Sequence, residues 1–345
     1  MKLGILGGGI GARVNINMDA IKHAEALGYD SVWTAEAWGG DAVTPATWIL
    51  AQTSKIKVGT AIMQMPARTP AMAAMTAMSL AELSGGRFIV GLGASGPQVI
   101  EGWHGVPYGK PITRRKEYVK IMKQIIAREE KVEFNGELYQ LPYAGAGATG
   151  LGKPLKSILH CEEDVPIFAA NITPNGVAAA AEVCDGFFPI WMDPQKYSVF
   201  QGPIEKGFAA AGDKNLTQFE VSPFVTVVMG DDVEKCMMPI RANMALYIGG
   251  MGARDKNFYN NYAKALGFED AAVKIQDLFL SGKKDEAAAA VPAELIDACH
   301  LVGPAERIKE RLAPWKEAGS KGHVAAMLLG CQQPEALEMI AGEML

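Results

Sequence analysis

The chain has 345 residues, of which 49% are hydrophobic and 21% charged, and its formal net charge at pH 7 is −5. This length can form one large domain or two ordinary ones, and the composition is typical of an α/β enzyme. The negative charge argues against a nucleic-acid or membrane partner, because both favour a basic protein surface.

The cysteines and the first residues indicate a cytoplasmic protein. Five cysteines are scattered along the chain without a CxxC pair, and there is no HExxH or paired His/Asp spacing. This pattern favours free thiols in a reducing compartment and predicts neither disulfides nor a metal site. The opening residues MKLGILGGG predict a strand and not a signal peptide, and no apolar run is long enough to span a membrane. We expect a cytoplasmic enzyme that acts on a small molecule.

Short apolar runs alternate with longer helix-like segments over the whole chain. Eight of these runs predict strands separated by helices, which indicates a parallel sheet and favours a closed (β/α)8 barrel over an open doubly wound sheet. The predicted strands are Lys2–Leu6, Ser31–Ala35, Lys57–Ile62, Phe88–Leu92, Pro166–Ala170, Gly186–Ile190, Glu220–Met229 and His323–Leu329. The predicted helices are Ile16–Leu27, Val43–Gln52, Pro70–Leu83, Arg114–Arg128, Thr173–Val183, Pro194–Ala211, Asp232–Tyr247 and a last one at Glu335–Leu345.

Capping residues before prolines predict where four of the helices start. These positions are Thr44, Thr69, Thr173 and Asp193, each followed directly by proline. No repeat or composition break divides the chain, so we expect a single domain over residues 1–345.

Two regions interrupt the alternation and are predicted as insertions after the fourth and seventh strands. Residues 131–165 contain a hairpin pattern with Asn135-Gly136 as its turn, followed by the glycine-rich stretch Ala144–Gly152. Residues 253–304 contain extra helical segments, and Leu301–Arg307 is predicted as a structural loop and helix start. Both insertions leave the carboxyl ends of barrel strands, where active sites of this fold are built.

Glycines follow the first and fourth predicted strands. Gly91-x-Gly93-x-x-Gly96 and Gly7-x-Gly9-x-x-Ala12 both match a dinucleotide-binding fingerprint, with Glu36 as the corresponding ribose acceptor. We favour the barrel, because the alternation continues through eight strands and the residues after Gly91–Gly96 do not predict a clean crossover helix opening at the glycines. In a barrel the same glycines let the backbone approach a flat ligand or tighten a turn.

Two residues at strand ends are candidates for proton transfer. Glu36 ends the second strand. Its carboxylate could transfer a proton, or it could form an ion pair with a neighbouring loop, and the sequence favours neither role over the other. His104 is a candidate proton donor or pocket wall, although a lone histidine is more often a packed hydrogen-bonding residue.

Further candidates follow the third and fifth strands. Ala61, Ile62 and Gln64 provide the apolar backing and hydrogen bonding that a planar ring requires. Small residues and a capped helix start at Thr173 predict a phosphate seat after the fifth strand, with a plain helix cap as the alternative. Gly7 and the tryptophans Trp38, Trp103 and Trp191 lie at strand ends and predict an apolar or aromatic-lined substrate pocket.

Together these segments resemble the bacterial-luciferase-like superfamily, and most closely its branch of oxidoreductases that depend on the deazaflavin coenzyme F420. The matching stretches are the glycine-rich first strand, AEALGYDSVWTAEAW (Ala24–Trp38), KVGTAIMQMPARTPAMAAM (Lys57–Met75), LSGGRFIVGLGASGPQVIEGWHG (Leu83–Gly105) and PIFAANITPNG (Pro166–Gly176).

The resemblance implies a (β/α)8 barrel with F420, or alternatively the flavin FMN, at its carboxyl-terminal mouth. It implies a non-prolyl cis peptide at Ala61-Ile62 behind the ring, and it places Glu36 and Trp38 near the ring or the substrate. The residues it assigns to cofactor binding are Ala61, Ile62, Gln64, Gly93, Ala94, Ser95 and Gly96, with Ala169, Ala170, Asn171 and Gly176 at the phosphate-bearing tail.

At two positions this sequence differs from some members of the family, and the difference argues against one reaction. Some deazaflavin sugar-phosphate dehydrogenases of this family have an acidic residue after the fourth strand and a histidine after the strand-two acid. Here those positions hold Gly96 and Ala37, so we do not expect sugar-phosphate oxidation by that pair.

The predicted function is hydride transfer between F420 and a small organic substrate, with Glu36 or His104 handling the accompanying proton. The alternatives are an FMN-dependent monooxygenase that uses reduced flavin and O2, and a non-catalytic protein that binds a flavin or deazaflavin. The helix Pro70–Leu83 carries Ala and Met on several faces, which predicts a homodimer or higher homo-oligomer, although burial within one subunit explains it equally well.

Overall fold

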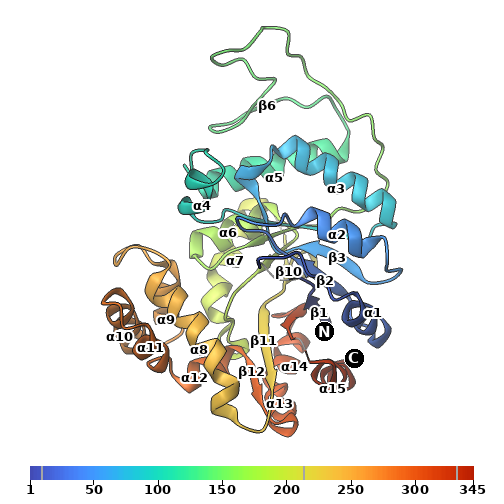
Figure 1. Cartoon of the computed structure of the whole chain (residues 1–345). Coiled ribbons are helices and arrows are strands. Elements are labelled where there is room, and N and C mark those ends of the chain that lie inside the picture. Colours follow the sequence, from blue (N-terminus) through green and yellow to red (C-terminus); the bar gives the residue numbers. More distant parts are fainter. Residues whose placement is uncertain (9–10, 213, 332) are drawn as a thin grey trace.

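The computed structural model describes residues 1–8, 11–212, 214–331 and 333–345, and its centre is a curled parallel sheet surrounded by helices (Figure 1). The sheet order is β10-β9-β8-β5-β3-β2-β1-β13-β11-β12, with β4 paired to β5. The strands are β1 Lys2–Leu6, β2 Ser31–Thr34, β3 Lys57–Thr60, β4 Met63–Gln64, β5 Phe88–Gly93, β8 Ile167–Ala170, β9 Gly186–Phe188, β10 Glu220–Val221, β11 Phe224–Met229, β12 Leu301–Gly303 and β13 Ala326–Gly330. The predicted α/β class with a parallel sheet is confirmed.

One short segment of the chain connects strands that lie far apart in the sheet order. The predicted seventh strand, Glu220–Met229, is broken into β10 and β11 at Ser222-Pro223. Ser222 N donates to Phe187 O of β9 at 3.0 Å, while Leu328 N of β13 donates to Pro223 O at 2.9 Å. The same short segment therefore hydrogen-bonds to strands on both of its sides.

The helices cover the outside of the sheet, and the two termini lie close together (Figure 1). Thr69 caps α3 by accepting from Met72 N at 3.1 Å, and Thr173 caps α6 by accepting from Gly176 N at 3.2 Å, as predicted. The helices are α1 Met18–Leu27, α2 Val43–Leu50, α3 Pro70–Ser84, α4 Pro97–Gly102, α5 Pro111–Ala127, α6 Pro174–Val183, α7 Ser198–Ala211, α8 Val233–Gly250, α9 Phe258–Ala265, α10 Glu269–Leu280, α11 Lys284–Ala289, α12 Ala293–Cys299, α13 Ala305–Arg311, α14 Ala313–Ser320 and α15 Pro334–Met344.

Two predicted helix starts differ in detail. The helix α2 begins at Val43, before Thr44-Pro45, because the Asp41 carboxylate accepts from the N–H groups of Val43 and Thr44 at 2.9 and 2.8 Å. Asp193 caps only a short 3-10 turn, Pro194–Lys196, and α7 begins after it at Ser198.

The structure corrects the prediction for Leu301–Arg307. Leu301–Gly303 is the strand β12, which pairs in parallel with β11, and α13 follows it. Leu301 and Val302 are both fully buried, and this burial favours pairing with the sheet over a loop. Residues 253–304 therefore contain α9 to α12 and this strand.

The hairpin in residues 131–165 is present, but its turn is shifted. The strands β6 Phe134–Asn135 and β7 Gln140–Leu141 pair so that Asn135 lies opposite Gln140, which makes residues 136–139 the turn. The buried carboxylate of Glu117 on α5 accepts from three N–H groups of this turn, those of Glu137, Leu138 and Tyr139, at 2.6 to 3.0 Å. The segment that holds β6 lies beyond α3 and α5 at the top of Figure 1.

Aromatic side chains fill the inside of the curled sheet. Trp33, Phe168 and Phe188 come from three different strands, and their ring centroids lie 4.9 to 6.0 Å apart. Ile89, Ala326 and Leu328 complete this cluster, and Leu6, Ala61, Ile62, Ala170 and Phe224 pack against it. The inside is thus a packed apolar layer rather than a channel.

Disulfides, membrane-spanning helices and clusters of metal ligands are not found among the described residues. All five cysteines are free thiols, as predicted. No helix in the described ranges is long and apolar enough to cross a membrane. Among the same residues, no three His, Cys, Asp or Glu side chains gather as metal ligands.

Candidate cofactor and active site

The turn after β3 lies against the glycines that end β5. The peptide bond between Ala61 and Ile62 is cis, as the family resemblance implied. A Cβ on Gly91 would lie 1.7 Å from Thr60 O, and one on Gly93 would lie 2.6 Å from Ile62 Cδ1. These two glycines are therefore required by the close packing of β3 and its turn against β5.

Close packing also explains Gly7, the first glycine of the other fingerprint match. A Cβ on Gly7 would lie 2.2 Å from Val32 Cγ2 of the neighbouring strand β2. Gly9 lies outside the described residues. Close contact between strands thus accounts for three of the glycines without a dinucleotide.

Glu36 is buried, with 8% of its surface exposed, and both of its oxygens are fully hydrogen-bonded. Oε1 accepts from Gln64 N and Arg68 Nη1, each at 2.6 Å. Oε2 accepts from Ala42 N at 3.0 Å and Arg68 Nη2 at 2.9 Å. Burial lowers the pKa of Arg68, but hydrogen bonds and charge from Glu36 outweigh burial and hold that pKa above its usual value. Glu36 therefore joins the loops after β2 and β3.

The side chain of Gln64 connects this carboxylate to His104. Its Nε2 donates to Ala37 O at 3.1 Å and to Ser95 Oγ at 3.2 Å. Its Oε1 lies 2.7 Å from His104 Nε2. Gln64 is fully buried and His104 is half-buried. The two predicted proton-transfer residues, Glu36 and His104, thus belong to one hydrogen-bonded network that passes through Gln64.

The turn after β5 is held from two sides. Ser95 adopts a left-handed backbone conformation with φ of 58°. Gln64 contacts its side chain, and the hydroxyl of Tyr108 donates to its carbonyl oxygen at 3.3 Å. Burial raises the pKa of Tyr108, which favours this neutral hydroxyl donor. Ala94 and Gly96 flank Ser95, so the predicted ring contacts lie on a fixed turn.

The end of β8 and the start of α6 form a second polar region around Arg115 of α5. Arg115 is 2% exposed, and its Nη1 and Nη2 donate to Gly176 O at 3.2 Å and Ala170 O at 3.3 Å. Burial lowers its pKa. Among the described residues, Arg115 Nε and Asn171 Nδ2 are buried donors without a hydrogen-bond partner, and no carboxylate pairs with the guanidinium.

This second region has the properties of an anion site. It combines a desolvated cation, two unsatisfied donors and the N-terminus of a ten-residue helix. A Cβ on Gly176 would lie 2.0 Å from Asn171 Oδ1, so glycine leaves room for that side chain. Ala169, Ala170, Asn171 and Gly176 therefore lie together at the end of β8 and the start of α6, where Arg115 donates to Ala170 and Gly176.

Sequence reasoning missed Arg68 and Arg115. Arginines are usually exposed, and although Arg68 lies within the matching stretch Lys57–Met75, neither arginine was assigned a role there. For Arg115 a signal did exist, because it lies on the same helical face as the apolar residues Tyr118, Val119 and Met122. A charged residue in a buried stripe indicates a partner or a ligand.

The three predicted pocket tryptophans differ in their exposure. Trp38 and Trp103 are each 63% exposed, whereas Trp191 is 2% exposed. The Trp191 ring packs against Tyr247 and Tyr259, with centroids 5.9 and 5.7 Å away. Trp191 thus belongs to the core beneath α8 and α9, while the other two lie on open surface near the ends of β2 and α4.

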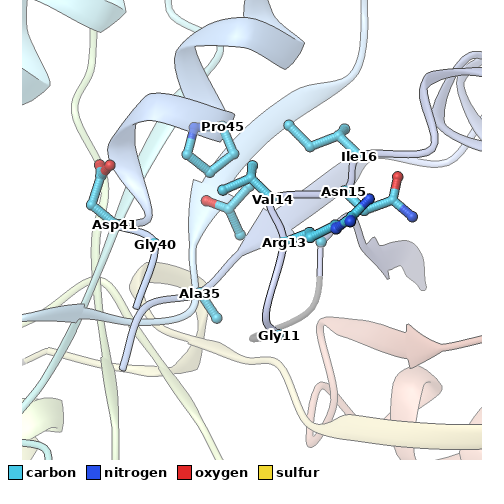
Figure 2. Close-up of a pocket in the computed structure, with 11 residues that line it drawn as sticks. Gly11, Arg13, Val14, Asn15, Ile16, Ala35, Gly40, Asp41 and Pro45 are labelled. Atoms are coloured by element: carbon cyan, nitrogen blue, oxygen red, sulfur yellow. The ribbon is translucent and has the colours of Figure 1, made fainter. Parts of the chain in front are cut away.

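A small pocket opens beyond the carboxyl ends of β1 and β2 (Figure 2). One side is the loop with Arg13, Val14 and Asn15, and the other side contains Asp41 and Pro45. Ala35, which directly precedes Glu36, lies between these two sides in Figure 2, and Thr34 also lines the pocket. Burial raises the pKa of Asp41, but hydrogen bonds from Thr44 and Val43 and the charge of Arg68 outweigh it and hold that pKa below its usual value.

Known proteins resemble this chain over most of its length. A model of the luciferase-like monooxygenase family matches residues 6–322. A protein of Mycobacterium tuberculosis that is provisionally named a coenzyme F420-dependent oxidoreductase is 42% identical over 322 residues, which cover 92% of this chain and 93% of the relative.

Two solved structures share the fold. The F420-dependent tetrahydromethanopterin reductase of Methanopyrus kandleri superposes with a TM-score of 0.76 at 21% identity, covering 99% of this chain and 97% of that one. The oxygenating constituent of 3,6-diketocamphane monooxygenase from Pseudomonas putida, solved in complex with FMN, gives a TM-score of 0.63 at 17% identity and covers 99% and 97%.

Proposed function

Because this chain belongs to the luciferase-like monooxygenase family, we propose that it is an oxidoreductase that transfers a hydride between coenzyme F420 and a small organic substrate. The name of the 42% identical relative supports F420 over other coenzymes. In this proposal the curled sheet is a (β/α)8 barrel with insertions after its fourth and seventh strands, and the coenzyme lies at the carboxyl ends of the strands.

The buried, unpaired guanidinium of Arg115 is the observation that carries the proposal. A desolvated cation without a carboxylate is costly to fold, so its presence is most simply explained by an anionic ligand. The free donors of Arg115 and Asn171 would hold the phosphate of the coenzyme tail, together with the N-terminus of α6. The donor set therefore fits a phosphate-bearing coenzyme.

The ring would lie between the turn after β3 and the turn after β5. Ala61 and Ile62 pack on the aromatic layer inside the sheet and offer an apolar surface. Gln64, Ala94, Ser95 and Gly96 would border the ring's polar edge, next to Gly93. The bound coenzyme supplies the carbon that carries the hydride, and this chain orients it and excludes water around it. Gly7, Trp38 and Trp103 remain proposed contacts on the substrate side.

Direct binding tests this proposal. Purified protein is titrated separately with F420 and FMN, and the ligand is identified by its absorbance, a single band for the deazaflavin and two bands for an oxidised flavin. The protein is then mixed anaerobically with reduced F420 and a hydride acceptor, either a methylene-tetrahydropterin or a simple ketone, and we expect reoxidation of the coenzyme. Tight binding of FMN with no binding of F420 at the same concentrations would contradict the proposal.

An FMN-dependent monooxygenase is the second candidate, because the family model describes monooxygenases and the fold also carries FMN in a solved structure. It predicts O2 consumption that depends on reduced FMN. The third hypothesis is a non-catalytic binding protein, and the same anaerobic mixing tests it. In that case the coenzyme binds, but no co-substrate oxidises or reduces it.

We also propose that the protein is a homo-oligomer whose contact surface includes the outer face of α3. Met72, Met75 and Leu83 on that face are 52%, 55% and 83% exposed, and Trp48 of the neighbouring helix α2 is 58% exposed. Glu82 is the only charged residue of α3. A helix that is apolar on all sides is expected to be covered on all sides, and an identical subunit offers a matching apolar face.

A further inference from the structure

We propose that Gln64 is a positioning residue that holds His104 with a proton on Nε2, so that Nδ1 is the ring atom that takes up or releases the proton accompanying the reaction. The role of that proton rests on the proposed function. The tautomer of His104 follows from hydrogen bonds within the protein alone.

The orientation of the Gln64 amide is fixed by a backbone carbonyl. Oxygen and nitrogen of an amide look alike in shape, so their assignment depends on the partners. One end of the amide lies 3.1 Å from Ala37 O, which can only accept a hydrogen bond. That end must therefore be the NH2 group, and it also donates to Ser95 Oγ.

The orientation of the amide determines the tautomer of His104. The other end of the amide is the oxygen Oε1, which can only accept, and it lies 2.7 Å from His104 Nε2. His104 must therefore donate from Nε2. Its Nδ1 has no hydrogen-bond partner among the residues that the structure describes. This bond persists in both charge states of the ring, because the neutral ring and the imidazolium both carry a proton on Nε2. The ring can thus bind or release one proton at Nδ1 without turning.

Glu36 is not available for the same task. Four N–H groups donate to its two oxygens, and two of them belong to Arg68. A proton added to either oxygen would displace one of these donors. Instead, Glu36 accepts from the backbone N–H of residue 64 and so fixes the start of the Gln64 side chain. Glu36 and Arg68 therefore position Gln64, and Gln64 positions His104.

The experiment is nuclear magnetic resonance of the coenzyme-free protein with 15N-labelled histidine rings. The chain has five histidines, and His104→Gln identifies the signals of His104. At a pH high enough for the histidine rings to be neutral, we expect His104 to carry its proton on Nε2. We also expect that proton to exchange slowly with water. Gln64→Met removes the acceptor at nearly constant size and should speed this exchange at least tenfold.

Two further variants make the result specific. Gln64→Glu retains an acceptor for Nε2–H but loses the donor to Ala37 O, so exchange should be slower than in Gln64→Met, which a merely structural defect would not produce. Gln98→Met changes an exposed glutamine on α4 and should leave the His104 signals unchanged. If Gln64→Met fails to fold, Ser95→Ala, which removes only one partner of the amide nitrogen, should broaden or shift the same signals.

A neutral His104 with its proton on Nδ1 would overturn the inference, as would equal exchange rates in the wild-type protein and Gln64→Met. Absence of F420 binding would contradict the proposed function but would not alter these signals. In turnover with reduced F420, we expect Gln64→Met to lower kcat, because the amide acts through His104, and to raise the KM for the coenzyme, because Gln64 borders the proposed ring site. A change confined to KM would overturn the positioning role.

Discussion

Arg68 binds Glu36 through both of its terminal nitrogens, with Nη1 2.6 Å from Oε1 and Nη2 2.9 Å from Oε2. The Glu36 side chain is 5% exposed and the Arg68 side chain 20%. This geometry is the bidentate arrangement that favours arginine over lysine. It joins the segment after β2 to the segment after β4, and the predicted ring site lies beside this connection.

Glu36→Gln should destabilise the fold by about 3 kcal/mol, because it removes the hydrogen-bonded partner of a largely buried guanidinium and leaves only Asp41, 4.0 Å away, as counter-charge. The free energy of unfolding, measured in urea, checks this. Glu343→Gln is the matched control, since Glu343 pairs with Lys316 at 3.1 Å on the surface, and it should change the same quantity by less than about 0.5 kcal/mol. Equal effects of the two substitutions would contradict a structural role for Glu36.

Arg115→Met should lower the affinity for the coenzyme without lowering the stability of the fold. The guanidinium hydrogen-bonds only to backbone carbonyls, so its removal should leave thermal stability unchanged or raise it. The affinity for F420 or FMN should fall roughly tenfold to a hundredfold, because charge-assisted hydrogen bonds to a phosphate are lost. Titration of both ligands checks this, with Lys120→Met, an exposed position on α5, as control. Unchanged affinity would remove Arg115 from the coenzyme site.

The apolar runs were sufficient to predict the parallel sheet, because strands buried on both faces have near-continuous hydrophobic sequences. They could not predict β12, which is three residues long and lies directly before Pro304. The break between β10 and β11 did have a sequence signal. Pro223 lacks the N–H that an unbroken strand requires, so it favours a break at this position.

The errors at the hairpin and at the site have a common cause. The turn at residues 136–139 is set by Glu117, about 20 residues earlier, which outweighs the local preference of Asn135-Gly136. In the same way, the partner of Glu36 is Arg68 in another loop. Pairings between distant segments depend on the folded geometry, and no local pattern in one sequence encodes them. Candidate residues at strand ends could be predicted, but not their partners.

Acid should destabilise the protein partly through His300. Burial lowers the pKa of His300 to about 4, and its Nδ1 accepts from Thr226 N at 3.1 Å. The unfolded chain binds this proton near pH 6.5, so it holds more protons than the native state between about pH 6.5 and 4. Stability is therefore full above pH 6.5 and decreases as the pH falls through this window, by up to about 3 kcal/mol from this group.

Urea unfolding at pH 7.5 and 4.5 measures this effect. Other groups also titrate in the window, so the informative quantity is the difference between the wild-type protein and His300→Gln. We expect His300→Gln to lose about 2 kcal/mol less than the wild-type protein between the two pH values. His160→Gln, at an exposed position, should behave as the wild type does. An equal loss in all three proteins would show that His300 does not contribute.

The proposed contact surface on α3 predicts a change of oligomeric state. Met75→Glu should place a charge in the centre of the apolar face and favour the monomer, because desolvating an unpaired carboxylate in an interface is costly. Light scattering after size-exclusion chromatography measures the mass. Lys120→Glu changes the charge of an exposed position on α5 and should leave the mass unchanged. Since Met75 is 55% exposed within one subunit, the Met75→Glu monomer should keep its fold. A wild-type protein that is already monomeric at micromolar concentration would rule out this surface as an interface between copies.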